Sequence, residues 1–253
     1  MRQGIMGGGR KKWLLGAVLL AACVMPARAQ DAGNGYLFGV PDGGLVIRFG
    51  YAIASANSDF YRQTTSLFNV DKSDFNGPTV GGEFDIRVAP RFDVALDVAW
   101  AGVTRQSHYR NLIDNNDQEI EQSTSVNRVP VTVNVKAYLA SRGRSVGRLA
   151  YIPSKVVPWV GAGVGASWYK VRQAGDFVAN TGAVYSDEIT DSGWGPAFQG
   201  MGGVDVTLTP RIALMGDARY LWSRASMGSA SFAGFDKIDL SGVSVALGVT
   251  FRL

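Results

Sequence analysis

Hydrophobic and polar residues alternate with a period of two along much of this chain. In the segment APRFDVALDVAW (89–100), Phe92 and Leu96 fall on one face, whereas Asp93 and Asp97 fall on the other. Successive side chains of a β-strand point to opposite sides of a sheet, so this pattern predicts strands with one apolar and one polar face. A similar phrase returns as TPRIALMGDARYLW (209–222), and we attribute the recurrence to similar turn chemistry rather than to a repeat.

Eight such runs follow one another along the sequence. They cover roughly residues 43–55, 79–89, 92–105, 124–140, 156–171, 194–208, 211–224 and 238–253. Two connections are tight turns that contain Pro90 and Pro210, and four are longer links rich in Ser, Asn, Asp and Gly. The link 141–155 is the one long connection on the short-turn side. Long loops at one end, short turns at the other and an even number of strands predict an all-β fold, an eight-stranded antiparallel up-and-down transmembrane β-barrel.

The direction of the apolar face separates a membrane barrel from a soluble, lipocalin-like barrel. Three features favour an apolar face turned toward lipid. Small residues such as Ala95, Gly161 and Gly163 occupy the polar face, which suits a narrow, crowded lumen. Aromatic residues gather at the ends of the runs, as they do at membrane interfaces. The third feature is that eight steps along a tilted strand span about 20 Å, near the ~25 Å apolar band of such barrels.

The aromatic residues divide between the two ends of the predicted barrel. A belt at the loop ends comprises Tyr51, Trp100, Trp168, Trp194, Tyr220 and Trp222, and we place Phe92, Trp159 and Phe251 at the turn ends.

Charged residues on the inward face are nearly balanced in sign. They are Arg48, Glu83, Asp85, Arg87, Asp93, Asp97, Lys136, Asp205, Asp217, Arg219 and Arg252. Unpaired charges are costly in a confined interior, whereas a balanced set can pair. We therefore predict a structural network of ion pairs that plugs the lumen, with a gated conduction path as the alternative.

The N-terminal segment has the features of an export signal. Residues 1–29 combine a basic start, an apolar run and an Ala-x-Ala site, which predicts a signal peptide, followed by a periplasmic segment (30–42) and the barrel (43–253). LAAC (20–23) leaves lipidation of Cys23 as an alternative. Without the five basic residues of 1–29, 20 basic and 21 acidic residues remain, so the charge gives no argument for nucleic-acid binding.

No motif in the sequence identifies a catalytic, metal or cofactor site. GAGVGA (161–166) matches a dinucleotide pattern, but the strand alternation continues through it. DNNDQE (114–119) starts like a calcium loop and lacks the required glycine. His108 is the one histidine, and its neighbour Ser107 would point to the opposite face of a strand. We predict a solvated role for the acidic stretch 173–193, and no enzyme.

Three segments carry a resemblance to a known family. VPWVGAGVGASWYKV (157–171), GVDVTLTPRIALMGDARYLW (203–222) and GVSVALGVTFRL (242–253) resemble the bacterial outer-membrane β-barrel domain family, which includes OmpA-, OmpX- and OmpW-type barrels. The resemblance implies a bacterial outer-membrane protein, with Phe251 near the terminal signal that the barrel assembly machinery reads. The predicted charged lumen departs from the apolar lumen of OmpW-type barrels and argues against transport of hydrophobic molecules.

The function expected from these patterns is a structural or surface-interaction role with long extracellular loops. A narrow channel or transporter for small solutes is the alternative, and a lipid-modifying outer-membrane enzyme is the third. We expect a monomer that contacts outer-membrane lipids, including lipopolysaccharide, and that needs no cofactor. The sequence identifies no external ligand.

Overall fold

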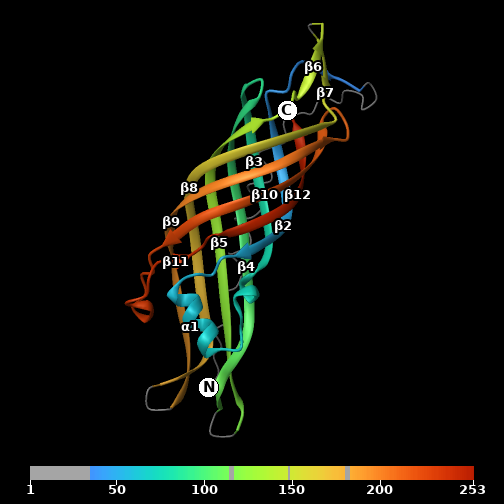
Figure 1. The fold of residues 1–253 in the computed structure, drawn as a ribbon. Helices are drawn as coiled ribbons and strands as arrows, with labels where there is room; N and C mark the ends of the chain where they lie inside the picture. Colours follow the sequence, from blue (N-terminus) through green and yellow to red (C-terminus); the bar gives the residue numbers. More distant parts are fainter. Residues whose placement is uncertain (1–34, 114–116, 148, 180–182) are drawn as a thin grey trace, which may run out of the picture. The chain divides into compact units, whose positions relative to one another are not determined.

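The computed structural model describes residues 35–253 except 114–116, 148 and 180–182. The predicted signal peptide and Cys23 lie outside the described residues. Eight long strands are present: β2 (Gly43–Ala54), β3 (Gly77–Ala89), β4 (Phe92–Ile113), β5 (Glu119–Tyr138), β8 (Val156–Val178), β9 (Val184–Thr207), β10 (Ile212–Ala225) and β12 (Gly242–Arg252). Each pairs with the next in antiparallel fashion, and β12 pairs with β2 (Figure 1). This closed ring confirms the predicted eight-stranded barrel.

The register of the strands shows how strongly they are inclined. A path through directly paired residues begins at one end of β2 and returns to β2 ten residues further along. It passes through Gly44, Asp85, Ala95, Asn134, Gly163, Gln199, Leu221, Gly242 and Ala54. Such a stagger means that the strands tilt relative to the barrel axis, and eight tilted strands leave an interior that side chains fill.

The apolar face of the barrel lies on the outside. Along β4, Leu96 is 50% exposed, whereas Asp97 beside it is 2% exposed. The same alternation places Val133 outside and Lys136 inside. Because the apolar side chains point outward over the whole ring, the exterior of the barrel suits the hydrocarbon of a membrane. Closure of the ring also leaves no strand edge with unpaired backbone groups, which hydrocarbon could not satisfy. Among the described residues, no helix combines the length and the apolar character needed to cross a bilayer.

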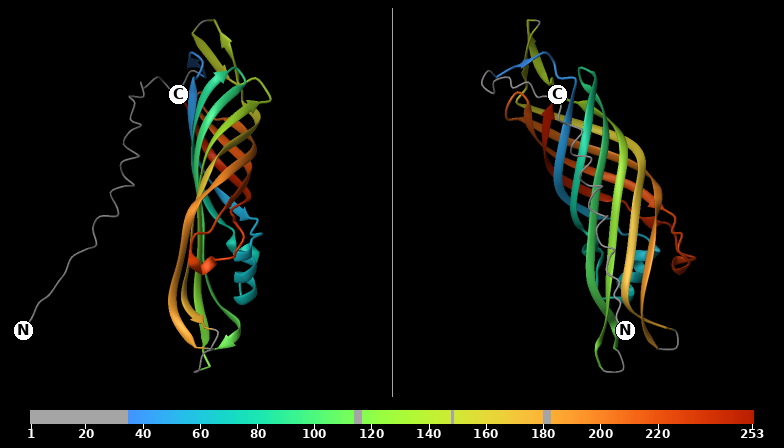
Figure 2. Two further views of the ribbon diagram at one scale, coloured as in Figure 1. Left: turned by 90° about the vertical axis from the view of Figure 1, so that its left-hand side faces the viewer. Right: turned by 180° about the vertical axis from the view of Figure 1, so that it is seen from behind.

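Four strands continue well past the barrel at the long-loop end, which corrects two predicted loops. We expected links at 106–123 and 172–193, but β4 pairs with β5 through His108↔Glu121, and β8 pairs with β9 through Val178↔Val184. These segments carry polar residues, so no apolar face marked them as strands, although their backbone ladders continue. We call the continuation of these four strands the extension (102–113, 119–127, 170–178 and 184–193; Figure 2).

The first and fourth connections fold together beside the extension. Helix α1 (Asp59–Leu67) and the 3-10 helix η1 (Lys72–Phe75) belong to the first, and η2 (Ala230–Phe232) and β11 (Ile238–Asp239) belong to the fourth. One face of α1 is buried, and Phe60 packs edge-on against Phe232. We call residues 55–76 and 226–241 the cap. Its apolar core covers the inner face of the extension, where it includes Val126 and Val171.

The short-turn end carries a small separate sheet. The link 141–155 forms a hairpin of β6 (Gly143–Val146) and β7 (Ala150–Pro153), and β1 (Leu37–Phe38) adds a third strand beside β7. Tyr151 of β7 is buried and lines the mouth of the barrel together with Arg142. The one long connection on the short-turn side thus forms a hairpin. We call the β1–β7–β6 sheet the mouth sheet.

Candidate functional site

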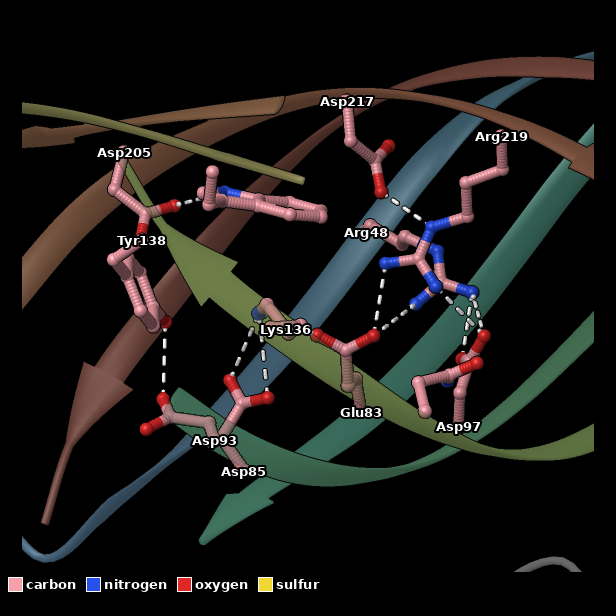
Figure 3. Close-up of polar contacts among 12 residues, drawn as sticks. Arg48, Glu83, Asp85, Asp93, Asp97, Lys136, Tyr138, Asp205, Asp217 and Arg219 are labelled. Atoms are coloured by element: carbon pink, nitrogen blue, oxygen red, sulfur yellow. Dashed lines mark hydrogen bonds and ion pairs between the residues drawn. The ribbon is translucent and has the colours of Figure 1, made fainter. Parts of the chain in front are cut away.

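The lumen of the barrel contains a compact group of ionised side chains centred on Arg219. Its Nε donates to Asp217 Oδ2 at 2.5 Å, Nη1 donates to Asp97 Oδ2 at 2.8 Å, and Nη2 donates to Glu83 Oε2 at 2.9 Å (Figure 3). All four residues are buried. One planar guanidinium therefore joins carboxylates from three strands, an arrangement suited to its fixed fork of donors.

Two further cations complete this group. Arg48 Nη2 lies 2.6 Å from Asp97 Oδ1. Lys136 Nζ lies 2.8 Å from Glu83 Oε1 and 3.3 Å from Asp85 Oδ1. Glu83 and Asp97 are direct register partners, an arrangement of like charges that is unfavourable without intervening cations. We call this set the lumen network: Arg48, Glu83, Asp85, Asp97, Lys136, Asp217 and Arg219.

Small residues make room for these large side chains. A Cβ atom on Gly81 would lie 2.8 Å from Arg48 Cζ, and one on Gly163 would collide with the amide of Asn134. A Cβ on Gly203 would lie 2.7 Å from the ring of Trp159. The glycines on the polar face are therefore spacers in a crowded lumen.

The short-turn half of the lumen is closed by a second group. Asp93 accepts hydrogen bonds from Arg142 Nη1 at 2.6 Å and from the Tyr138 hydroxyl at 3.0 Å. Trp159 Nε1 donates to Asp205 Oδ1 at 3.3 Å. Our placement of Trp159 at the membrane interface was wrong, because it is 1% exposed inside the barrel.

Nine of the eleven predicted lumen charges are buried, and two are not. Arg87 and Arg252 are half-buried at the mouth, outside the lumen network. The Arg252 guanidinium donates to Thr207 Oγ1, and Arg87 reaches only the carbonyl of Pro90. The sequence pattern missed Gln199, whose amide donates to Asp97, and Arg142, which lies in the hairpin link. The prediction relied on charged residues at inward-facing strand positions. Gln199 is neutral and Arg142 lies outside the predicted strands, so neither was selected.

The cap seals the long-loop end of the lumen. Arg128 Nη1 donates to the carbonyl oxygen of Leu240 at 2.5 Å, which ties β5 to the fourth connection. The backbone N–H of Asp59 donates to Asp236, and the N–H of Asp236 donates back to Asp59 Oδ2 at 2.9 Å. These two carboxylates therefore clamp the first connection to the fourth.

Two carboxyl groups of the described residues outside the membrane-facing barrel have shifted pKa values. The backbone N–H of Asp236 and the neighbouring Arg62 stabilise the carboxylate of Asp59 and lower its pKa below the usual 3.8. Arg172 forms a two-pronged hydrogen bond to Glu188 on the extension and lowers the pKa of that carboxyl. Both shifts favour the charged forms at neutral pH.

The six belt residues lie on the outside of the barrel. Trp168 and Trp194 are register partners on β8 and β9, and the rings of Tyr220 and Trp222 contact each other on β10. Tyr51 and Trp100 are exposed on β2 and β4. Aromatic rings at this boundary suit an interface at which lipid meets water.

The remaining candidate motifs do not assemble a reactive site. His108 Nδ1 lies 3.2 Å from Glu119 Oε2, whereas the Ser107 hydroxyl donates to the carbonyl oxygen of Gln122. No cluster of three potential metal ligands occurs in the described part of the chain. Asp114 and Asn116 of the calcium-loop motif lie outside the described residues. Asp191 of the acidic stretch is buried and accepts from the Tyr169 hydroxyl at 2.5 Å.

A closed sheet with an apolar exterior, an aromatic belt and an ion-paired lumen defines an outer-membrane β-barrel. The family model for the outer membrane protein beta-barrel domain matches residues 15–251, and the chain belongs to this family. The protein is located in the bacterial outer membrane. The short-turn end is thus the periplasmic end and the long-loop end is extracellular, as in this class of barrels.

Several solved structures are similar to this chain. Outer membrane protein OprG of Pseudomonas aeruginosa is 17% identical, with a TM-score of 0.46 over 86% of this chain and 99% of that chain. Neisserial surface protein A is 10% identical, with a TM-score of 0.44 over 87% and 98%. Outer membrane protein W of Escherichia coli is 16% identical, with a TM-score of 0.40 over 85% and 100%. No curated protein matches the chain.

Proposed function

We propose that this protein is a non-conducting barrel that holds an ordered surface outside the outer membrane. The observation that carries the proposal is the lumen network, in which seven buried charged residues bind one another across the bore. A solute passing through would have to displace guanidinium groups from buried carboxylates. Separating such pairs leaves uncompensated charges in a confined interior, which is strongly unfavourable.

Both ends of the lumen are also covered. At the extracellular end the cap packs Phe60, Tyr61 and Phe232 into an apolar core. At the periplasmic end, Arg142 lies over the ring of Tyr138 at 4.1 Å and binds Asp93. Three successive barriers of different chemistry therefore lie along the bore.

The surface presented to the outside is held by strand pairing and by packing against the cap. The extension continues the barrel ladders, and one of its faces is fixed by the cap. Its other face carries polar groups, such as the exposed Thr104 and the half-buried Ser125, whose hydroxyl oxygens lie 3.2 Å apart. A barrel without free edges is a stable mount for such a surface, and we propose that the extension is where external ligands bind.

Planar-bilayer recording tests the proposal directly. The folded protein, verified by its heat-modifiable gel mobility, should give no single-channel steps. Arg48→Ala with Arg219→Ala should also stay closed, because the cap and Arg142 remain in place. A variant that adds Arg142→Ala and Arg128→Ala to this pair loosens all three barriers and should introduce steps. Reproducible steps from the wild-type barrel would refute the proposal.

A narrow channel for small solutes is the second candidate. Cavities lie on both sides of the lumen network, one lined by Gln199 and Pro130 and the other by Asp205 and Arg252. Only the lumen network and the two covers would need to rearrange to connect these spaces. Steps in the wild-type recording whose conductance or open time increases when Arg142 is changed to Ala would favour this candidate.

We propose no catalytic role for His108. It lies on the polar face of the extension beside Glu119, and the hydroxyl of Ser107 is engaged on the opposite face. Any lipid-modifying activity of the purified barrel should therefore be unchanged in His108→Ala. Loss of such an activity in that variant would restore the enzyme hypothesis.

A further inference from the structure

The outside of β8, β9 and β10 changes character abruptly at the aromatic belt. On the membrane side of the belt this surface is apolar, with Val164 and Phe198 exposed side by side as register partners. Trp194 and Trp222 are 61% and 53% exposed at the boundary. Immediately beyond the boundary the exposed residues are Lys170 and Arg224.

The strand geometry places both cations on this outward surface. Lys170 is two residues beyond Trp168, and Arg224 is two residues beyond Trp222, so each cation shares a face with its tryptophan. Strand β9 pairs with both β8 and β10 and carries Trp194 between them. Lys170 lies opposite Ser192 of β9, whereas Ser223, next to Arg224, lies opposite Ala197. Two strand spacings combined with this offset along β9 separate the two Cα atoms by about 16 Å.

In the described part of the chain neither of these two cations forms an ion pair, unlike the next cation along the same surface. Arg172 is neutralised by Glu188, with contacts of 2.7 and 2.9 Å. Within the described residues, no ion pair involves Lys170 or Arg224. The register partner of Lys170 is the neutral Ser192, and Lys170 is near enough to Glu188 to help lower the pKa of that carboxyl. The register partner of Arg224 is Asp239, which is buried and accepts hydrogen bonds from the backbone N–H groups of Asn57 and Ser241. The boundary therefore carries two exposed positive charges that are not held in an ion pair, beside three tryptophans.

The opposite wall of the barrel lacks this feature. Beyond Trp100 on β4, the outward residues include Thr104 and Gln106, and Ser125 follows on β5. These side chains are neutral. Arg110, further along β4, is exposed but is paired with Asp71 at 3.5 Å. Next to the belt, exposed cations without an ion pair therefore lie on the β8–β10 wall, which indicates a localised binding surface.

We propose that Lys170 and Arg224 bind phosphate groups of the phosphorylated glycolipid of the outer leaflet. The acyl chains would lie against Val164, Phe198 and the tryptophans, and the phosphates would lie at the height of the cations. Guanidinium and ammonium groups form charge-assisted hydrogen bonds to phosphate oxygens. The hydroxyl groups of Ser192 and Thr190 lie further out, where the sugars of such a lipid begin.

The choice of a glycolipid follows from the side of the membrane. The cations lie at the extracellular boundary, and the exposed residues directly beyond them are mainly hydroxyl-bearing rather than apolar. A free phosphate ion would gain nothing from the adjoining apolar wall. A lipid that carries phosphate, sugar and acyl chains matches all three zones of this surface in the order in which they occur.

Binding of purified lipids to the detergent-folded full chain tests the proposal. The probes are bisphosphorylated lipopolysaccharide, the same lipid after enzymatic dephosphorylation, phosphatidylglycerol and inorganic phosphate, with bound lipid counted by native mass spectrometry. The wild type should retain the bisphosphorylated lipid. Lys170→Ala with Arg224→Ala should weaken retention by about thirtyfold, since each cation near an anionic lipid contributes roughly fivefold.

Two controls separate this surface from general attraction. Lys72→Ala with Lys237→Ala removes the same charge from exposed positions in the cap and should change retention by less than about threefold. Lys170→Gln with Arg224→Gln should behave like the double Ala variant and should keep the heat-modifiable mobility of the folded barrel.

Three results would overturn the proposal. One is equal retention by the wild type and the double variant. Another is equal binding of dephosphorylated lipid, since the phosphates would then be irrelevant. The third is equal, cation-dependent binding of phosphatidylglycerol or inorganic phosphate, which would assign the charges to anions in general. None of these results depends on whether the lumen conducts.

Discussion

The lumen network and the cap core are both interiors of one molecule, and they are built from opposite kinds of residue. The lumen buries ions such as Arg219 and Glu83, whereas the cap buries Phe60, Tyr61 and Phe232. Their exteriors are reversed in the same way, because the barrel wall is apolar and the extension is polar. The surrounding solvent accounts for the difference. Lipid contacts the apolar side chains of the barrel wall, whereas water contacts the polar side chains of the extension.

The two interiors therefore depend on different forces. In the lumen, stability requires that every cation has its carboxylates, because a buried charge without a partner is penalised. In the cap, stability comes from removing apolar surface from water and from close packing. A substitution of similar size should therefore act through charge in one region and through volume in the other.

The largest effect is expected from Arg219→Ala. This change leaves Asp217, Glu83 and Asp97 without their shared cation and should lower the free energy of unfolding by about 3–5 kcal/mol. Urea unfolding of the barrel in liposomes, followed by tryptophan fluorescence, measures the loss. Arg172→Ala, which breaks an exposed pair, is the control and should give no resolvable change. A barrel that loses less than about 1 kcal/mol with Arg219→Ala would contradict the charge argument.

A smaller and more local effect is expected from Phe60→Ala. Removing this buried ring should destabilise the cap by about 3 kcal/mol through lost burial and a residual cavity. Limited proteolysis should then cut within 55–76 while the barrel keeps its heat-modifiable mobility. Leu67→Ala, at an exposed position on the same helix, is the control. Loss of the folded barrel itself would show that cap and barrel are one cooperative unit.

The smallest effect concerns the pH dependence of the cap. Because the folded-state pKa of Asp59 is lowered, its contribution to stability is complete above the usual value of 3.8 and is lost as pH falls through the folded-state value. Protease resistance of the cap should therefore be constant from neutral pH to about pH 5 and decline only below about pH 4. Asp59→Asn should flatten this decline, and a decline that is unchanged in the variant would assign it to other groups.

The sequence pattern predicted the barrel well because one physical rule acts along its whole wall. Lipid on one side and a narrow lumen on the other enforce strict alternation, so strand positions and the inward placement of residues such as Asp97 and Lys136 were predictable. The extension was not predicted because water contacts its outer face. Its sequence therefore lacks a clear alternation of apolar and polar residues. Its strands are visible only through hydrogen bonds such as those of the Gln106↔Ser123 ladder.

The partners within the lumen could not be predicted from alternation. Alternation assigns Arg219 to the inside, but its contacts with Glu83 and Asp97 depend on the stagger of the whole ring. Trp159 was misplaced because its position near a strand end outweighed its parity, which matches that of the buried Val157. Arg142 reaches the lumen from a hairpin link, where no periodic rule applies.

The seam between β12 and β2 has a consequence for biogenesis. Strand β12 supplies hydrogen-bonding partners to both β10 and β2, so any shorter nascent chain has two open edges that hydrocarbon cannot satisfy. Insertion must therefore wait until the last strand has been delivered. A chain that lacks β12 cannot close this seam, so its unpaired strand edges disfavour its insertion into the bilayer.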